Sequence, residues 1–246
     1  MDMIRAVPGN GLLIGGHRGH LSHIRENTIA NFEEVYARGV PYIEIDVQLS
    51  ADGVPVIFHD RDLSLRTPLY GAVCDHSVNQ LKAAFDLCTL TEAIAWCKAH
   101  GMKMLLEIKS GDDHPQGQRL VLAQQIIQAI SAHQFYDDCI PFSIDYGIMR
   151  IIKTALPNIH IGLIGPVSPK DPVAWMKQMR ASLYVSYLKD MDAALVGRLH
   201  TAGYFVDGSI VNSKEELEKA AALQVDMIES DHPEKMIALR QGGCHA

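Results

Sequence analysis

Two acidic residues lie two positions apart in the apolar run YIEIDV (residues 42–47). Side chains alternate between the two faces of a β-strand, so Glu44 and Asp46 point to the same side if this run is a strand. Burying two like charges side by side is unfavourable unless a cation lies between them. The pattern therefore predicts a metal ion or a basic partner beside this segment.

A second apolar run, MLLEIK (residues 104–109), adds a third carboxylate and a basic residue. In a strand, Glu107 and Lys109 share one face. Three carboxylates suit a hard divalent cation better than zinc, which favours His or Cys ligands. We therefore expect Glu44, Asp46 and Glu107 to hold one Mg²⁺ or Ca²⁺ ion.

The run LLIGGHRGH (residues 12–20) predicts a strand that ends in a histidine and an arginine. Its glycines permit a close approach of the backbone and unusual φ angles at this point. His17 and Arg18 then stand at the carboxyl end of the strand, where barrel enzymes gather their catalytic groups. Arg18 and Lys109 are available to an anionic substrate, whereas His20 is expected to be a surface or packing residue.

A second imidazole follows a hairpin signal, because Asp52-Gly53 separates two strand-like runs and this pair favours a tight turn. If these two residues form the loop, residues whose numbers sum to 105 face each other, which places His59 opposite Asp46. Pro55 is compatible with a hairpin strand at the edge of a sheet. The hairpin is therefore predicted to bring His59 to the carboxylates.

This set of residue types is suited to attack on a phosphate ester. A bound divalent cation polarises a phosphoryl oxygen and lowers the pKa of a bound water or hydroxyl. Arg18 can bind two phosphate oxygens in fork geometry, and Lys109 can act as a point charge. His17 and His59 can serve as general base and general acid. The alkoxide that leaves a phosphodiester is a poor leaving group unless a general acid protonates it. A pair of histidines therefore favours a phosphodiester as substrate.

Eight strand-like segments alternate with helix-like segments along the chain. The predicted strands are 12–16, 42–48, 104–109, 140–144, 160–164, 183–187, 204–211 and 227–230. The predicted helices include 28–38, 91–100, 117–133, 146–155, 191–202 and 214–222. This count predicts an α/β fold, a (β/α)₈ TIM barrel forming one domain over residues 1–246, with a small hairpin-containing insertion at about 48–88. A doubly wound open sheet is the alternative, but polar residues end several different strands, which favours the barrel.

Composition excludes several other classes of protein. The 48% hydrophobic and 21% charged content is typical of a globular chain. A net charge of −7 without a long basic run argues against a nucleic-acid partner. No apolar stretch reaches the roughly 18 residues of a membrane helix, and five scattered cysteines indicate neither a disulfide framework nor a zinc site. We expect a cytoplasmic protein, monomeric or homodimeric, with no integral membrane segment.

Short motifs in a fixed order add a resemblance to a known family. They are GHRG (16–19), ENT (26–28), EID (44–46), DG (52–53), HD (59–60), RT (66–67), EIK (107–109) and, more weakly, VN (211–212) and VDMIESDHP (225–233). Together they resemble the glycerophosphodiester phosphodiesterase family. The resemblance implies a barrel that hydrolyses glycerophosphodiesters to glycerol 3-phosphate and an alcohol, by attack of water or of a substrate hydroxyl.

The resemblance also implies a role for each residue of the site. It makes His17 and His59 the acid/base pair and Arg18 and Lys109 the phosphate-binding residues. The implied metal ligands are Glu44, Asp46 and Glu107. 

The chain departs from the family pattern at Arg25, at Pro68 and at Ser209, where the family commonly has tryptophan. Loss of that tryptophan removes an apolar wall near the binding mouth and bears on the choice of alcohol. Three other functions are open to the same residues. They are a lysophospholipase D acting on single-chain phospholipids, a catalytically inactive binding barrel, and a Schiff-base enzyme that would need a depressed pKa at Lys109.

Overall fold

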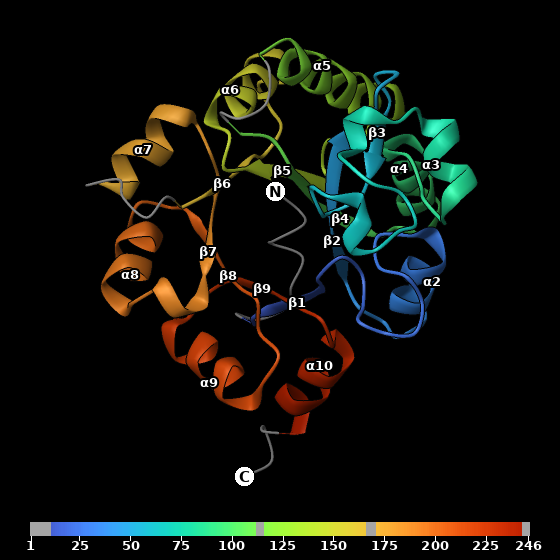
Figure 1. Cartoon of the computed structure of the whole chain (residues 1–246). Helices are drawn as coiled ribbons and strands as arrows, with labels where there is room; N and C mark the ends of the chain where they lie inside the picture. Colours follow the sequence, from blue (N-terminus) through green and yellow to red (C-terminus); the bar gives the residue numbers. More distant parts are fainter. Residues whose placement is uncertain (1–10, 112–115, 166–170, 243–246) are drawn as a thin grey trace.

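Eight parallel strands form a ring surrounded by helices in the computed structural model, which describes residues 11–111, 116–165 and 171–242 (Figure 1). The strands of the ring are β1 (Leu13–Gly16), β2 (Tyr42–Leu49), β4 (Lys103–Ile108), β5 (Cys139–Ser143), β6 (Gly162–Ile164), β7 (Leu183–Tyr187), β8 (Phe205–Ser209) and β9 (Met227–Ser230). The order β1-β9-β8-β7-β6-β5-β4-β2 closes through a β1–β2 pairing at Gly16 and Ile43. Closure confirms the predicted barrel and excludes the open sheet.

The helices lie outside the ring. They are α2 (Ile29–Ala37), α3 (Val78–Ala84), α4 (Leu90–His100), α5 (Gln116–His133), α6 (Tyr146–Ala155), α7 (Pro172–Met179), α8 (Ala193–Thr201), α9 (Lys214–Leu223) and α10 (Pro233–Gly242). Several begin at side chains that cap free N–H groups, such as Thr28 before α2 and Ser213 before α9. Of these helices, α3, α7 and α10 were not among those named from the sequence.

Alternation along the strands divides the core into two layers. One layer fills the barrel and consists of Leu13, Tyr42, Leu105, Ile140, Phe142, Leu183, Val185 and Met227. The other layer separates the ring from the helices and includes Met104, Leu106 and Ile108 of β4. Since Leu105 faces the interior, Glu107 on the same strand does so as well. Gly15 makes room for the Tyr42 ring, because a Cβ there would lie 2.2 Å from a ring carbon.

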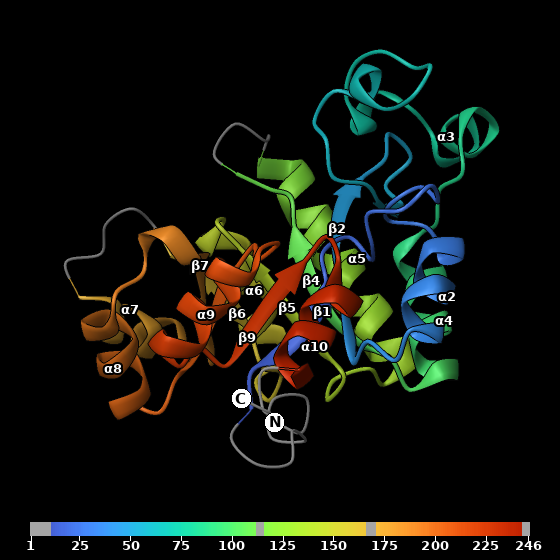
Figure 2. The ribbon, with the colours of Figure 1, turned by 90° about the horizontal axis from the view of Figure 1, so that it is seen from below.

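The segment after β2 stands outside the ring. It contains β3 (Pro55–Ile57), the 3₁₀ turns η1 (Leu63–Leu65) and η2 (Val73–Asp75), and α3, whereas a third 3₁₀ turn, η3 (Leu188–Asp190), follows β7. The segment projects beyond the end of the barrel toward which β2 points (Figure 2). A small apolar centre of its own stabilises it, made of Val56, Phe58, Leu63, Val73, Leu81 and Leu87.

The hairpin register is one residue away from the prediction. β3 pairs antiparallel with β2 as its edge partner, but Val47 lies opposite Ile57, so facing residues sum to 104 and not 105. The loop therefore has three residues, 51–53, and Gly53 adopts a φ of +77°. Ser50 accounts for the longer loop, because its Oγ accepts a hydrogen bond from Val54 N at 3.0 Å and its carbonyl accepts one from Gly53 N at 3.0 Å.

None of the helices among the described residues is long and apolar enough to cross a membrane. Four of the five cysteines, Cys74, Cys88, Cys97 and Cys139, lie in the described part and are free thiols.

Candidate active site

Three carboxylates meet inside the barrel at the carboxyl end of two neighbouring strands. Glu44 and Asp46 lie on β2, and Glu107 on β4 is the register partner of Asp46. One oxygen of each lies within 4.8 Å of the others. Glu44 and Asp46 are buried, whereas Glu107 is partly exposed. The predicted shared face of Glu44 and Asp46 is thus observed, and parallel pairing adds Glu107 to it.

Two basic residues contact this carboxylate cluster (Glu44, Asp46 and Glu107). Lys109 Nζ lies 3.0 Å from Asp46 Oδ1 and 2.8 Å from Glu107 Oε1. The backbone N–H of Arg18 donates to Glu44 Oε2 at 3.0 Å. The Arg18 guanidinium lies 3.6 Å from Asp46 Oδ2 and donates to Glu26 Oε1 at 3.1 Å. These contacts offset part of the negative charge.

The surroundings shift the pKa values of Glu44 and Asp46 in opposite directions. Burial raises the pKa of Glu44 well above its ordinary value, and the charges of Asp46 and Glu107 raise it further. Burial also acts to raise the pKa of Asp46, but nearby positive charge, chiefly that of Lys109 and then of His59, outweighs it and lowers this pKa. The pKa values of these two neighbouring carboxyls are thus shifted in opposite directions.

Lys109 is a permanent cation in this environment. Burial acts to lower its pKa, but the charges of Asp46 and Glu107 outweigh that effect and raise the pKa above its ordinary value. A Schiff-base nucleophile must be a neutral amine. The geometry therefore argues against the Schiff-base reading of this lysine.

His17 is oriented by a carboxylate from the opposite end of the chain. Its Nδ1 lies 2.7 Å from Asp231 Oδ1, which follows β9. Asn212 holds the same carboxylate, donating to Asp231 Oδ2 at 2.7 Å and accepting from Asp231 N at 2.8 Å. The hydrogen bond with His17 lowers the pKa of Asp231. Asp231 is thus an ionised partner that leaves His17 Nε2 for proton transfer.

His59 has a matching carboxylate partner. Its Nδ1 lies 2.7 Å from Asp60 Oδ1, and Arg66 Nε donates to Asp60 Oδ2 at 2.8 Å. Burial acts to raise the pKa of Asp60, but the hydrogen bond and charge of His59, with Arg66, lower it. Asp60 therefore holds the His59 ring.

Gln48 brings His59 to the cluster despite the shifted register. Its buried side-chain Nε2 lies 2.8, 3.1 and 3.0 Å from the carbonyl oxygens of Phe58, His59 and Asp60. The backbone still pairs with β2 at Phe58, whose N–H donates to the Asp46 carbonyl at 2.9 Å, and the carbonyls of residues 58–60 then converge on Gln48. The position of His59 therefore depends on Gln48 as well as on the predicted hairpin pairing.

Asn27 is a further polar contact of the cluster. Its Nδ2 donates to Asp46 Oδ2 at 2.9 Å, and it adopts a positive φ of +58°. In the sequence it was noticed only as part of the ENT motif. Its buried amide fixes the orientation of Asp46.

A cavity of about 830 Å³ lies over these groups. Six of the seven predicted residues line it, and these are His17, Arg18, Glu44, His59, Glu107 and Lys109. The seventh, Asp46, is buried beneath it and contacts Lys109. The opposite wall comes from β5 onward and is mainly apolar, with Phe142, Ile144, Ile164, Tyr184, Val185, Tyr187 and Leu195. The structure thus brings the predicted site residues together beside a wall that the sequence analysis did not foresee.

The carboxylate cluster fits a hard divalent cation. Three carboxylates are the ligand type that Mg²⁺ and Ca²⁺ prefer. Glu44 Oε1 is buried and has no hydrogen-bond partner, which is unfavourable for a carboxylate oxygen unless a ligand occupies it. A cation here would satisfy this oxygen.

Comparisons with known proteins identify the family of the chain. A model of the glycerophosphoryl diester phosphodiesterase family matches residues 17–235. The glycerophosphodiester phosphodiesterase of Caldanaerobacter subterraneus subsp. tengcongensis is 29% identical over 244 residues, which cover 94% of this chain and 99% of the relative. That of Bacillus altitudinis is 24% identical and covers 93% of this chain and 98% of its own length.

Solved structures show the same architecture. A phosphodiesterase from Oleispira antarctica, solved in complex with its product sn-glycerol-3-phosphate, has a TM-score of 0.86, 25% identity and coverage of 93% of this chain and 96% of its own. The Thermotoga maritima glycerophosphodiester phosphodiesterase has a TM-score of 0.79, 21% identity and coverage of 94% and 99%. Because the family model spans most of the sequence, this chain belongs to the glycerophosphoryl diester phosphodiesterase family.

Proposed function

We propose that the protein hydrolyses glycerophosphodiesters to glycerol 3-phosphate and an alcohol, with one divalent cation as cofactor. The observation that carries the proposal is a single cavity lined by members of a three-carboxylate cluster and by two histidines, each with its own carboxylate partner. Family membership and full-length relatives named glycerophosphodiester phosphodiesterase support the same reaction. A small-molecule diester is therefore the partner of the site.

Glu44, Asp46 and Glu107 would hold the cation, Mg²⁺ or Ca²⁺. When bound, it supplies polarisation of a phosphoryl oxygen and a lower pKa for the attacking hydroxyl or water. The unpartnered Glu44 Oε1 and the short separations of the three carboxylates support this assignment.

His17 and His59 would transfer the protons. One accepts the proton of the nucleophile and the other donates a proton to the leaving alkoxide. Asp231 and Asp60 fix the two rings through Nδ1, so Nε2 of each ring is free for the transfer. Each of these carboxylates has a lowered pKa, and an ionised partner stabilises the imidazolium that forms during proton transfer.

Arg18 and Lys109 would bind the phosphate. Both line the cavity, and Lys109 keeps its positive charge at neutral pH. A cation at the cluster would weaken the hold of Asp46 and Glu107 on Lys109. The lysine ammonium would then be available to a phosphate oxygen.

Release of glycerol 3-phosphate from a panel of diesters tests the proposal. We expect release by the wild type with Mg²⁺ or Ca²⁺, loss with EDTA, and loss in His17→Ala. His23→Ala is the matched control, because His23 is exposed in the same loop and lies outside the site. No release from any diester with either cation would overturn the proposal and favour an inactive binding barrel.

A lysophospholipase D activity is the second candidate, favoured by the apolar cavity wall. Ile144 and Tyr187 line the cavity and are 56% and 61% exposed, as an acyl-chain contact at a cavity mouth would be. Comparing kcat/KM for choline release from glycerophosphocholine and from lysophosphatidylcholine decides between the candidates. A higher value for the single-chain lipid would assign the second activity.

A further inference from the structure

A second group of potential metal ligands joins the loop after β1 to the start of α10. His20 lies in the loop after β1, and His232 and Glu234 lie on either side of the first residue of α10. One ligand atom from each lies within 4.8 Å of the other two. We propose that His20, His232 and Glu234 bind a transition-metal ion of the Zn²⁺ class, at a site separate from the carboxylate cluster.

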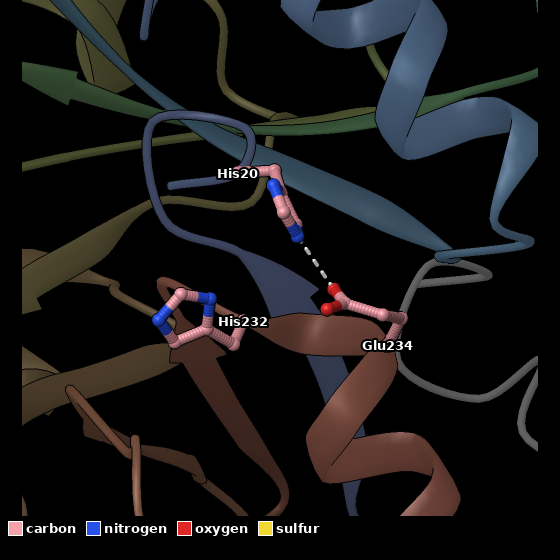
Figure 3. A group of neighbouring side chains, drawn as sticks. All are labelled: His20, His232 and Glu234. Atoms are coloured by element: carbon pink, nitrogen blue, oxygen red, sulfur yellow. Dashed lines mark ion pairs between the residues drawn. The ribbon is translucent and has the colours of Figure 1, made fainter. Parts of the chain in front are cut away.

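His20 is the strongest support for a bound ligand. The residue is 6% exposed, and both of its ring nitrogens are buried without a hydrogen-bond partner. Its Nε2 is directed at Glu234 Oε2, 2.8 Å away, but this ion-pair contact lacks hydrogen-bond geometry (Figure 3). Buried polar atoms are nearly always satisfied by protein, water or an ion. A metal ion would satisfy the Nε2 lone pair of His20 and the carboxylate of Glu234 together.

The type of donor distinguishes this site from the carboxylate cluster. Two imidazoles and one carboxylate are a ligand set that binds zinc, whereas three carboxylates favour Mg²⁺ or Ca²⁺. Three protein ligands leave a fourth position for water. The expected order of affinity therefore places Zn²⁺ and Co²⁺ above Mg²⁺ at this site.

The three ligand atoms must shift from their present positions to form a tetrahedral coordination sphere. Tetrahedral zinc with bonds of about 2.0–2.1 Å places its ligand atoms about 3.4 Å apart. The two imidazole rings lie edge to face with centroids 5.8 Å apart, and His232 lies to one side of the His20–Glu234 pair (Figure 3). His232 and Glu234 are only partly buried, so the His232 ring and the Glu234 carboxylate have room to turn toward His20.

Hydrogen bonds to the backbone hold the segments that carry His20 and His232 in place. The Asn31 side chain of α2 forms two hydrogen bonds with the backbone of His20. It accepts from the His20 N–H at 2.8 Å and donates to the His20 carbonyl at 2.9 Å. Leu21 N donates to the carbonyl of Asp231 at 2.7 Å, which ties this loop to the end of β9. Lys235 N donates to the His232 carbonyl at 3.1 Å in the first turn of α10. The ordering cost of binding is correspondingly small.

An ion at this site links the two segments that hold His17 and its carboxylate partner Asp231. His20 lies three residues after His17, and His232 follows Asp231 directly. Metal binding there therefore stabilises the folded state and fixes the His17–Asp231 contact. Binding of this ion can be measured without reference to the proposed hydrolase activity.

Direct binding to the full-length apoprotein tests the proposal, with 10 mM-scale Mg²⁺ present to occupy the carboxylate cluster. Co²⁺ absorption in the visible region and Zn²⁺ calorimetry should both report one ion per chain, with a raised Tm. Removal of outer-sphere partners alone weakens metal sites about 10- to 100-fold. We therefore expect His232→Gln and Glu234→Gln to weaken binding by more than about tenfold.

Two controls separate this site from the other possibilities. His23→Gln changes an exposed histidine of the same loop and should leave Zn²⁺ affinity unchanged. Glu107→Gln changes only the carboxylate cluster and should also leave it unchanged. His232 and Glu234 are partly exposed, so their substitutions test binding without opening the core.

Three results would overturn the proposal. They are no Zn²⁺ or Co²⁺ binding by the wild type, undiminished binding in both His232→Gln and Glu234→Gln, or loss of binding in Glu107→Gln alone. The first result would leave His20 and Glu234 as a simple ion pair. The other two would assign the ion elsewhere, the last to the carboxylate cluster.

Discussion

The two halves of the barrel contribute different chemistry to one cavity. The chain up to residue 109 supplies the cluster of charged or titratable residues His17, Arg18, Glu44, His59, Glu107 and Lys109, whereas Asp190, Asp192, Arg198 and Glu229 are the charged lining residues of the later part. The chain from residue 142 onward supplies a wall that is mainly apolar, such as Phe142, Val185 and Leu195. We infer that bond cleavage and the choice of alcohol depend on different strands. Substitutions should therefore change one of these two properties without the other.

The second half also carries acidic residues, but in a different electrostatic setting. Asp207 of β8 and Glu229 of β9 are buried in the barrel interior. Burial raises the pKa of both, and the charges of Asp207 and Glu44 raise that of Glu229 further. Asp46 is equally buried, yet Lys109 and other cations lower its pKa. Burial in the interior alone therefore raises the pKa of a carboxyl group. The cations of the first half are what lower the pKa of Asp46.

Loss of a carboxylate from the cluster should have the largest effect. Glu107→Gln removes a ligand that is partly exposed, and a bound metal contributes several kcal/mol to transition-state stabilisation. We expect metal-supported kcat/KM to fall by at least about a thousandfold for every diester, measured by glycerol 3-phosphate release. Exposed Glu218→Gln is the control. A loss confined to some alcohols would break the division between the halves.

Loss of a histidine should come next. His17→Ala removes one proton-transfer group, which is typically worth about 10²- to 10⁴-fold in rate. We expect kcat to fall by this amount for all diesters while KM changes little. Steady-state kinetics on diesters of three different alcohols would measure this fall in kcat. Activity within a factor of about three of the wild type would exclude His17 from the acid/base pair.

The free energy of unfolding should depend on pH through Glu229. Its pKa is raised in the folded protein, so the unfolded carboxyl ionises first as pH rises above about 4.3, and folding stability decreases until pH exceeds the folded pKa. Glu229→Gln removes this loss. We expect the variant to gain on the order of 1 kcal/mol relative to the wild type at pH 8 and less at pH 4, by urea unfolding. An equal difference at both pH values would mean that folding does not raise the pKa of Glu229.

Changes in the apolar wall should have the smallest effect. Ile144→Ala and Tyr187→Ala alter exposed contacts and should change the ratio of kcat/KM between a bulky and a small alcohol by less than about tenfold. The kcat for the smallest diester should stay constant. A parallel fall for all substrates would assign these residues to the chemistry and remove the contrast between the halves.

Much of the fold followed from local patterns in the sequence. Alternation in YIEIDV and MLLEIK predicted two neighbouring strands whose inward faces carry Glu44, Asp46 and Glu107. Strand ends rich in polar residues predicted the barrel, because a closed ring gathers the ends of many strands at one mouth. These features depend on spacing over a few residues, which the sequence shows directly.

The remaining features depend on contacts between distant or irregular segments. Asp231 lies 214 residues from His17, and no local pattern links the two. The hairpin register depended on hydrogen bonds of Ser50, so the Asp-Gly signal located the turn but not its length. His59 reaches the site through Gln48, and His20 meets Glu234 through loop geometry. Periodicity carries no information on such contacts.

A crystal structure of the protein with Ca²⁺ and glycerol 3-phosphate would test the central claim most directly. The account predicts one Ca²⁺ bound by Glu44, Asp46 and Glu107, with the phosphate near Arg18 and Lys109 and between the two histidines. A Ca²⁺ ion at any other position, or a phosphate bound away from His17 and His59, would contradict it.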